Sequence, residues 1–318
     1  MAKPNEIIEA MATRSMKKMR IAFVFAGGAQ SYMTAKGRIK LEDGGPTITN
    51  PLLVGGNPNV GPATYYDHVP VARSSELDTV SYDMTRSVGT LVISDQEVDE
   101  NQGDAKIVDI AAAKLKALEI AIKKYQRKNM ANTNAGKYPQ GLGNLLPLVN
   151  TAGSIGNINL AVEPLWRHNV YQFSGTVTSA NIEDTFDDIL LDLNTDDGKV
   201  TVIFAGRKIF SMHRAAARNK DTSRQLGTSG FSTSLANLGL TGTTHQQIEI
   251  IYDEELDPDM AYFINENEMM VHILKSANMK VKDLTAPYDQ DVTGKRYIIE
   301  NQLCSWKQNR THAVFINR

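Results

Sequence analysis

A long apolar periodicity between Asp104 and Met130 constrains this chain more than any other feature. Apolar residues recur there at three- and four-residue spacing, and no Gly or Pro interrupts them before Gly136, so they share one face of an α-helix. Asp104 lies at the N-terminal end and a basic cluster at the other end, which is the order that the helix dipole favours. Roughly 27 residues at ~1.5 Å each span ~40 Å, which exceeds the mean globular helix. The sequence therefore predicts a rigid spine helix over 104–130.

The composition is that of a globular chain, with 42% hydrophobic and 22% charged residues among 318. This length suffices for one large or two modest cores. The net charge of −2 disfavours a protein dedicated to phosphate backbones, which usually carries a basic excess. A single cysteine excludes an internal disulfide and a thiolate metal site. No window approaches the ~18 apolar residues of a membrane span, so we expect a soluble chain in a cytoplasm-like environment, with no membrane partner.

The residues before the helix divide into three parts. We expect 1–36 to be an N-terminal arm that lies on a neighbouring subunit, because a short apolar stripe there is followed by a loose segment. From 37 to about 71, Gly, Pro and Asn are frequent, as in loops and flexible ribbons, and the remaining strand formers predict a long hairpin-like arm. Partly alternating β-branched runs then predict two strands near 80–84 and 88–93, the second ending at Ser94 or Asp95.

A region of mixed helices and strands follows a predicted domain boundary near Gly141. Asn181 is expected to cap a helix whose apolar face begins at Ile182. The run VTVIFA predicts a short buried strand, and RKIFSMHRAAARNK predicts another helix. An Asp-Pro turn separates further strands, and the last residues, 297–318, are expected to form a terminal strand pair. These elements predict an α+β fold.

The sequence offers little catalytic chemistry. It contains no Walker-type phosphate loop, no G-x-G-x-x-G after a strand, no H-E-x-x-H and no G-x-S-x-G. The segment from Asp192 to Gly198 resembles a calcium loop, but its glycine is one position late and Ile203 replaces the bidentate Glu, so we interpret it as a turn. The histidines are spread singly, without ligand spacing, and are interpreted as structural or solvated. They are His68, His168, His213, His245, His272 and His312.

A basic run also requires an interpretation. We read it first as a solvated helix face, next as an interfacial ion-pairing surface, and only then as a phosphate-binding surface. Its members are Arg207, Lys208, Arg214, Arg218, Lys220 and Arg224. Cys304, beside Trp306, is interpreted as a small hydrophobe. Gly27-Gly28 lacks a third glycine at the needed spacing and a clear following helix, so we predict a flexible bend rather than a phosphate turn.

The order of these parts resembles the major capsid proteins of tailed bacteriophages, of the Hong Kong 97 fold type. Several patterns resemble a podovirus- and siphovirus-associated branch, namely SVGTLVISDQEVDENQGDAKIVDIAAAKLKALE and GLGNLLPLVNTAGSIGNINLAVEPLWRHN. The match continues through GKVTVIFAGRKIF, AYFINENEMMVHIL and QLCSWKQNRTHAVFI. It covers about residue 35 to the C-terminus, and the order of the motifs is more specific than any one of them.

The resemblance implies a shell subunit. It assigns 1–36 to an N-terminal arm, 37–87 to the extended E-loop, 88–140 to the P domain with its spine helix, and 141–296 to the A domain. Residues 297–318 would return to the P domain. The family's shells consist of hexamers and pentamers, are built with a scaffold and a portal, and enclose double-stranded DNA. We therefore expect a virion capsid protein assembled in the host cytoplasm, a separate scaffolding protein because the N-terminal region is short, and room for a decoration protein.

Seven residues are the candidate intersubunit contacts, by their place in the predicted arm and at the basic end of the spine helix. They are Lys40, Leu52, Leu53, Lys123, Lys124, Arg127 and Lys128. Lys36 and Lys40 are available for the lysine crosslink of some relatives, but no positional match supports that chemistry. We expect no enzyme activity, cofactor or metal. Two alternatives stay open: a nucleic-acid-binding protein that uses 207–224, and an enzyme with a site in 141–296, which would need a deep pocket near His213 or His245.

Overall fold

The computed structural model describes most of the chain. The described residues are 28–53, 59–65, 68, 77–94, 96, 104–131, 133, 137–173, 177–194, 199–220, 242–284, 292–308 and 311–317. The expectations for 1–27 and for Arg224 lie outside these ranges. Within them, no helix is long and apolar enough to cross a membrane.

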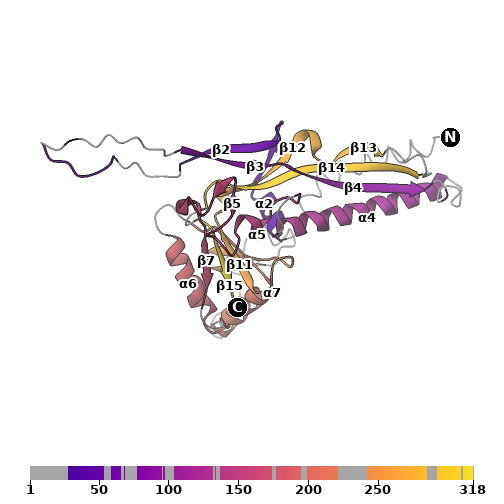
Figure 1. The fold of residues 1–318 in the computed structure, drawn as a ribbon. Helices are drawn as coiled ribbons and strands as arrows, with labels where there is room; N and C mark the ends of the chain where they lie inside the picture. The colour runs from indigo at the N-terminus through magenta and orange to yellow at the C-terminus, as the bar shows by residue number, and fades with distance from the viewer. Residues whose placement is uncertain are drawn as a thin grey trace.

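The first sheet is built around one long strand, β14 (Val292–Ser305). β14 pairs on one side with β4 (Thr85–Ser94) and on the other with β12 (Met269–Leu274) and β13 (Lys280–Leu284), and β1 (Ile39–Glu42) extends the sheet beyond β12. Helix α4 (Asp104–Met130) runs along β4, as Figure 1 shows. The long helix therefore lies where the periodicity predicted it, and β4 ends at Ser94 as expected.

Helix α4 contacts this sheet through a small cluster of apolar side chains. Buried Leu115 and half-buried Leu118 and Ile122 pack against Leu91, Tyr297 and Ile299 of the sheet. A Cβ added at Gly89 of β4 would lie 3.1 Å from Leu118, so the helix approaches the strand closely. One face of α4 is thus covered, while apolar Ile120 on another face is exposed.

The second sheet has six strands in the order β7-β15-β11-β8-β10-β9. Their bounds are β7 (Asn169–Gln172), β15 (Ala313–Ile316), β11 (Met260–Ile264), β8 (Val202–Ala205), β10 (Ile248–Tyr252) and β9 (Gly242–His245). Successive side chains of β8 point to opposite faces of the sheet, so its alternate residues belong to different cores. Ile203 and Ala205 pack with α6 (Ile182–Leu193) and α7 (Arg207–Lys220), whereas Val202 and Phe204 join the larger core toward the first sheet.

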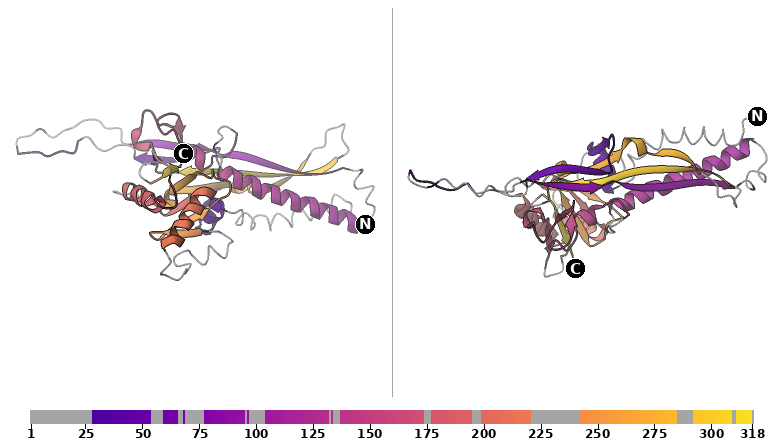
Figure 2. Two further views of the ribbon diagram at one scale, coloured as in Figure 1. Left: turned by 90° about the horizontal axis from the view of Figure 1, so that it is seen from below. Right: turned by 45° about the horizontal axis from the view of Figure 1, so that its top comes forward.

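A two-stranded arm leaves the body at the junction of the sheets. β2 (Thr47–Leu53) and β3 (Leu77–Asp83) pair antiparallel, with Ile48 opposite Tyr82. Figures 1 and 2 show the arm and α4 extending in opposite directions, with residues 59–65 at the far end of the arm. The subunit is therefore elongated rather than globular. The prediction of a reaching hairpin agrees with this shape but not in its bounds, because β1 pairs in the first sheet and β3 lies beyond residue 71.

The root of the arm is fixed by buried contacts. The Tyr82 hydroxyl donates a hydrogen bond of 2.8 Å to the Ser305 carbonyl, and the Tyr82 and Trp306 rings meet edge-on. The small hairpin of β5 (Ser154–Ile155) and β6 (Ile158–Asn159) supports β3 from below, because the Ser81 amide donates to the Gly156 carbonyl at 2.9 Å. Short elements complete the described fold: α5 (Leu142–Leu145), η2 (Pro164–Trp166), η3 (Glu266–Glu268) and η4 (Lys275–Ala277).

The expectation of an arm on a neighbour is wrong for the part of 1–36 that the structure describes. Residues Gly28–Ala35 form helix α2, and Ala29, Tyr32 and Met33 are buried in the larger core. Gly28 has a φ of 55°, and an added Cβ would lie 1.9 Å from an Asp253 oxygen. The Asp253 carboxylate accepts a 2.9 Å hydrogen bond from the Ala29 amide, so it caps this helix. The prediction of a plain bend at Gly27-Gly28, with no following helix, is therefore also wrong.

The predicted terminal strand pair is wrong as well. β14 and β15 belong to different sheets: β15 lies between β7 and β11, and only β14 runs beside β4. Likewise, β12 and β13 fall within the predicted 141–296 unit but pair with β14 in the first sheet. An alternating pattern indicates a strand but does not specify its partner strand, because pairing depends on long-range packing. Sheet membership therefore does not follow the boundary placed at 296.

The cap expected at Asn181 also differs from the structure. Asn181 precedes α6, but its side chain makes no cap bond to the helix. Its Oδ1 accepts instead from the Thr178 amide at 2.7 Å. The Asn181 side chain thus bonds within a local turn instead of capping the helix, a competition that is common for Asn.

Candidate intersubunit surfaces

The histidines of the second sheet come closer together than their sequence positions suggest. His213 Nε2 lies 3.4 Å from His245 Nδ1, and His245 Nε2 lies 2.6 Å from Asp187 Oδ1. The sequence spacing of these two histidines therefore gives no sign that they meet in space. Phe186 stacks on the buried His213 ring and meets His245 edge-on. No group of three or more ligating residues suited to a metal occurs in the described part of the chain.

Two other histidines are structural. His168 Nε2 lies 2.7 Å from the Pro147 carbonyl, and burial lowers its pKa to about 4. His312 Nδ1 accepts from the Asn265 amide at 3.2 Å, and burial lowers its pKa to about 3. Both rings are neutral near pH 7, since their pKa values lie far below it. They join segments of the core, as the structural interpretation of these residues predicted.

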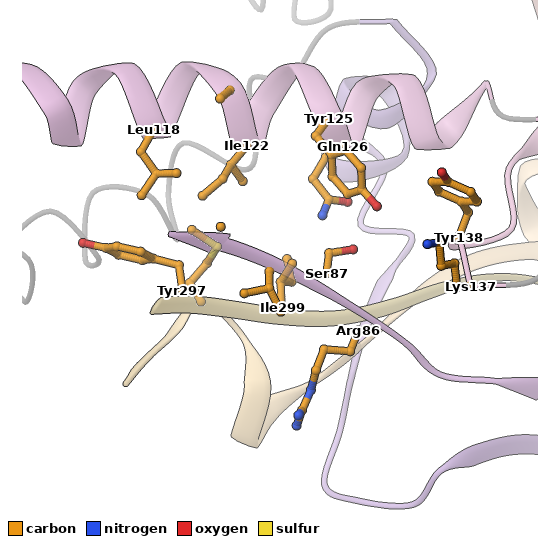
Figure 3. A pocket seen from close by; sticks show the side chains of 14 residues that line it. Arg86, Ser87, Leu118, Ile122, Tyr125, Gln126, Lys137, Tyr138, Tyr297 and Ile299 are labelled. Carbon is orange, nitrogen blue, oxygen red and sulfur yellow. The ribbon is translucent and has the colours of Figure 1, made fainter. Parts of the chain in front are cut away.

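A groove of about 530 Å³ lies between α4 and the first sheet. Figure 3 shows Leu118, Ile122 and Tyr125 of α4 on one side of it, facing Tyr297 and Ile299 of β14. Its other lining residues are Arg86, Ser87, Val88, Gly89, Ala121, Gln126, Lys137, Tyr138 and Met279. The lining is mainly apolar and contains no carboxylate or imidazole. Such a lining suits the binding of an apolar segment of a partner better than it suits catalysis.

Polar groups are also available inside this groove, named here the α4 groove. Ser87 Oγ, Gln126 Nε2 and the Tyr297 hydroxyl are buried without a hydrogen-bond partner within the described residues. A buried polar group without a partner is costly, so such groups favour a site that another chain completes. At its edge, Val88 is 52% exposed, which is high for a large apolar residue in a strand.

The predicted basic end of α4 divides into two kinds of residue. Lys124 and Lys128 are exposed. Lys123 pairs with Glu119 one turn earlier, with Nζ and Oε1 2.8 Å apart. Arg127 pairs with Glu254 at 3.1 Å and lies 3.8 Å from Asp253 Oδ1. Arg127 therefore ties α4 to the residues after β10 within one chain.

The predicted arm contacts divide between two places: Lys40 lies in β1 of the first sheet, and Leu52 and Leu53 lie at the outer end of β2. Lys40 Nζ is 3.0 Å from Glu42, whose carboxylate also lies 2.8 Å from His272 Nδ1. Burial lowers the pKa of His272, and these groups line a polar cavity of about 480 Å³ that also includes Trp306. Leu52 packs partly against the chain's own core. The side chain of Leu53 lies outside the described residues, although its backbone pairs with Leu77.

The remaining candidates have ordinary structural surroundings. Arg207, Arg214 and Arg218 are exposed on α7, and the side chain of Lys220 lies outside the described residues. Asp192 accepts a hydrogen bond from the Tyr171 hydroxyl. Lys36 pairs with Glu249 at 3.5 Å. Cys304 is fully buried, and burial raises the pKa of its thiol, so it behaves as the small hydrophobe that was predicted.

Sequence reasoning missed Asp253, which brings α2, α4 and β10 together. Its side chain is almost fully buried, and it accepts hydrogen bonds from the Ala29 and Glu255 amides. A lone acidic residue after an apolar strand gives no signal of this role. It also missed the buried polar groups of the α4 groove, because Ser87 and Gln126 look like ordinary surface residues in their local sequence.

No protein-family model and no curated protein sequence matches the chain. Solved structures do match it. The capsid protein of cyanophage A-1(L) superposes with a TM-score of 0.63 and 13% identity, over 88% of this chain and 90% of that one. The chain has the Hong Kong 97-type fold.

Other structures with a similar arrangement show how widely this fold occurs. The capsid of Myoviridae phage XM1 has a TM-score of 0.54 at 11% identity, covering 90% of this chain and 92% of that one. The SrpI encapsulin of Synechococcus elongatus PCC 7942 has a TM-score of 0.54 at 10% identity, covering 88% and 84%. The Hong Kong 97-type fold thus occurs in viral capsids and in an encapsulin shell.

Proposed function

We propose that this chain is the major capsid protein of a tailed bacteriophage. Copies of it form hexamers and pentamers, which build an icosahedral head shell around double-stranded DNA. The elongated subunit carries the proposal: the arm and α4 extend in opposite directions and leave apolar side chains exposed (Figure 2). Surfaces of this kind are normally covered by a partner. The likeness to the cyanophage A-1(L) capsid supports a shell as that partner.

Within this proposal, each part of the subunit has a place. The first sheet and α4 form the P domain, the second sheet with α6 and α7 forms the A domain, and β2 with β3 forms the E-loop. Because β12 and β13 pair with β14, they belong to the P domain. β15 belongs to the A domain, since it pairs with β7 and β11. Domain membership thus follows the sheets rather than the predicted limits at 141 and 296.

We assign the α4 groove to the arm of a second copy. The far part of the arm carries Val60 and Tyr65, which are 83% and fully exposed, and the groove offers a complementary apolar lining. Obligate interfaces commonly exceed about 2,000 Å². At ~25 cal/mol per Å² of apolar area, many such contacts stabilise a shell strongly. The exposed Lys124 and Lys128 lie on the same helix and extend the contact surface.

The role of the chain is mechanical rather than catalytic. His213 and His245, the residues on which an enzyme site would depend, are covered by the Phe186 ring. A subunit with a net charge of −2 suits a container that holds DNA without strong adhesion. The further partners of the proposal are a separate scaffolding protein, a portal and a decoration protein, with assembly in the host cytoplasm.

A shell that carries no phage genome is the second candidate. The encapsulin likeness is its basis: the TM-score of 0.54 equals that of the XM1 capsid, while the cyanophage A-1(L) capsid reaches 0.63. The content of the particle separates the two candidates. Nuclease-protected, genome-length DNA in particles made with the neighbouring phage proteins supports the virion, and particles that never take up DNA support the alternative.

Negative-stain electron microscopy of the purified chain, alone and with neighbouring phage proteins, tests the proposal. We expect shells, tubes or free capsomers. Val88→Ser at the groove should reduce their number, whereas Val162→Ser is the matched control, because Val162 is also exposed (67%) but does not line the groove. Persistent monomers under every condition would contradict a coat protein. Equal assembly of both variants would contradict only the groove assignment.

A further inference from the structure

Two neighbouring helices of the second sheet carry opposite charge. Helix α6, IEDTFDDILLDL, has five acidic residues and no basic one. Helix α7, RKIFSMHRAAARNK, has five basic residues and no acidic one. Both helices pack on the same face of the sheet, where their apolar residues share one core. Figures 1 and 2 show them side by side below the arm. Most protein surfaces intersperse the two signs, so this separation needs a cause.

Helix stability supplies only part of that cause: the dipole favours Glu183 and Asp184 in the first turn of α6 and Arg218 in the last turn of α7, but not the other charges. Asp192 lies at the C-terminal end of α6, and Arg207 lies at the N-terminal end of α7, which are the ends where the helix dipole disfavours these charges. Asp184 and Asp188 are like charges four residues apart, and so are Arg214 and Arg218. Such pairs destabilise a helix. The arrangement therefore agrees with the dipole at one end of each helix and opposes it at the other end.

Lys208 and Asp187 have partners within the chain, Asp259 and His245, but four other charges of the two helices have none among the described residues. Asp184 and Asp188 are exposed and have no ion-pair partner among the described residues. The same is true of Arg214 and Arg218, whose described contacts are the Phe210 ring and a backbone carbonyl. Leu191 is 72% exposed beside these acidic residues. A large apolar side chain among unpaired charges is typical of a surface that a partner covers.

Helix α6 crosses the sheet, since Asp187 lies 2.6 Å from His245 of β9 at one edge and Asp192 contacts the opposite edge, whereas α7 packs near β10. The α6 side chain Asp192 bonds to Tyr171 of β7, the strand at one edge. Phe210 of α7 packs on Tyr252 of β10, near the other edge, with ring centroids 5.6 Å apart. Two different surfaces on one copy can join copies head to tail, and such a contact closes into a ring when the rotation permits.

We propose that the α6 surface of one copy (Asp184, Asp188 and Leu191) binds the α7 surface (Arg207, Arg214 and Arg218) of the next copy around each capsomer. The inference rests on the proposed shell function and specifies one contact within it. Nucleic acid is a less suitable partner for the α7 surface, because the acidic α6 surface beside it repels phosphate. A second copy offers both surfaces in the required order. Charge complementarity of this kind fixes the register of an interface and excludes wrong partners.

Charge exchange tests this contact. In D184K/D188K the α6 surface becomes basic like the α7 surface, and in R214E/R218E the α7 surface becomes acidic like the α6 surface. We expect each variant to need at least about tenfold more protein for half-assembly at low salt, because like charges then meet. An equimolar mixture of the two should recover hexamers, since the two variants can alternate around a ring with an even number of copies. A chain with all four substitutions should recover too. The charge-conserving pairs D184E/D188E and R214K/R218K are the matched controls and should assemble like the parent.

The outcomes separate this inference from the proposed function. If the parent chain forms no assembly, the shell function fails and the contact with it. If the parent assembles and both reversal variants assemble equally well, the contact is wrong and the shell function stands. Recovery in the four-substitution chain but not in the mixture would show pairing within one chain, which also overturns the inference. Normal assembly of R214E/R218E with loss of bound DNA would reassign the α7 surface to nucleic acid.

Folding of the variants is checked by circular dichroism and thermal melting before assembly is measured. If a reversal variant does not fold, the neutral pairs D184N/D188N and R214Q/R218Q replace it. Each neutral pair should weaken assembly, and their effects should not add when both are present, because each removes the same contact. Additive effects would overturn the inference.

Discussion

Replacing Asp253 tests how the two sheets are held together. Its two carboxylate oxygens accept separate backbone hydrogen bonds, Oδ2 from the Ala29 amide at 2.9 Å and Oδ1 from the Glu255 amide at 3.1 Å. The side chain is only 1% exposed, so Asp253→Ala leaves both donors buried without a partner. Each such donor costs about 1–3 kcal/mol. The substitution also removes the desolvation cost of a buried carboxylate, which offsets part of this loss. We therefore expect a net loss of about 2–4 kcal/mol in the free energy of unfolding.

Urea unfolding of dissociated subunits, followed by circular dichroism, measures this loss. Asp253→Asn keeps one acceptor and should lose about half as much. Glu254→Ala is the matched control: Glu254 is 58% exposed and pairs with Arg127, so its removal should cost under about 1 kcal/mol. If Asp253→Ala is no more destabilising than Glu254→Ala, the carboxylate does not cap α2 in the way described.

The effect of pH on this variant has a definite sign. Burial raises the pKa of Asp253 above its ordinary value, more than the backbone hydrogen bonds lower it. The folded state therefore favours the protonated carboxyl more than the unfolded state does. The stability that Asp253 contributes is fully present below the unfolded pKa and declines as pH rises through the folded pKa. The difference between the parent and Asp253→Ala should consequently be larger near pH 4 than near pH 8.

Three further predictions concern the core. Phe186→Ala should lower the free energy of unfolding by about 3–5 kcal/mol in urea, because a large, fully buried ring is lost; a loss below about 1 kcal/mol would refute its central position. Gly156→Ala should cost about 2–5 kcal/mol, since φ is +58° and its Cβ would lie 2.1 Å from Val80, while Gly153→Ala, with open space, should show only the backbone part. His168 and His312 have lowered pKa values, so stability should fall as pH drops below about 6.5; an unchanged urea midpoint between pH 7 and 5 would contradict this.

The parts of the fold that the sequence predicted are those with local causes. Helix α4 was predicted because its periodicity is uninterrupted over its whole length. β8 was predicted because VIFA is a short, continuously apolar run, and it is buried on both faces. The arm followed from the density of Gly, Pro and Asn, which disfavours a compact element. In each case the information lies within the segment itself.

The parts that were missed depend on distant residues. Helix α2 is short and begins at a glycine, and its cap comes from Asp253, more than two hundred positions away. β15 is short and apolar like β8, and nothing in it specifies β7 and β11 as partners. The approach of His213 to His245 arises because α7 and β9 both pack against the Phe186 ring. The α4 groove similarly needs a helix and two strands, which no single segment encodes.

The place of β15 in the second sheet determines when a subunit can finish folding. β15 lies between β7 and β11, although it follows both in the chain by at least 49 positions. The ribosome must therefore pass Ile316 before β7 can join the rest of the sheet. Until then the nascent chain has an open gap between β7 and β11, and α6 and α7 lack part of the surface on which they pack. The surface on which α6 and α7 pack is thus completed only when β15 inserts between β7 and β11.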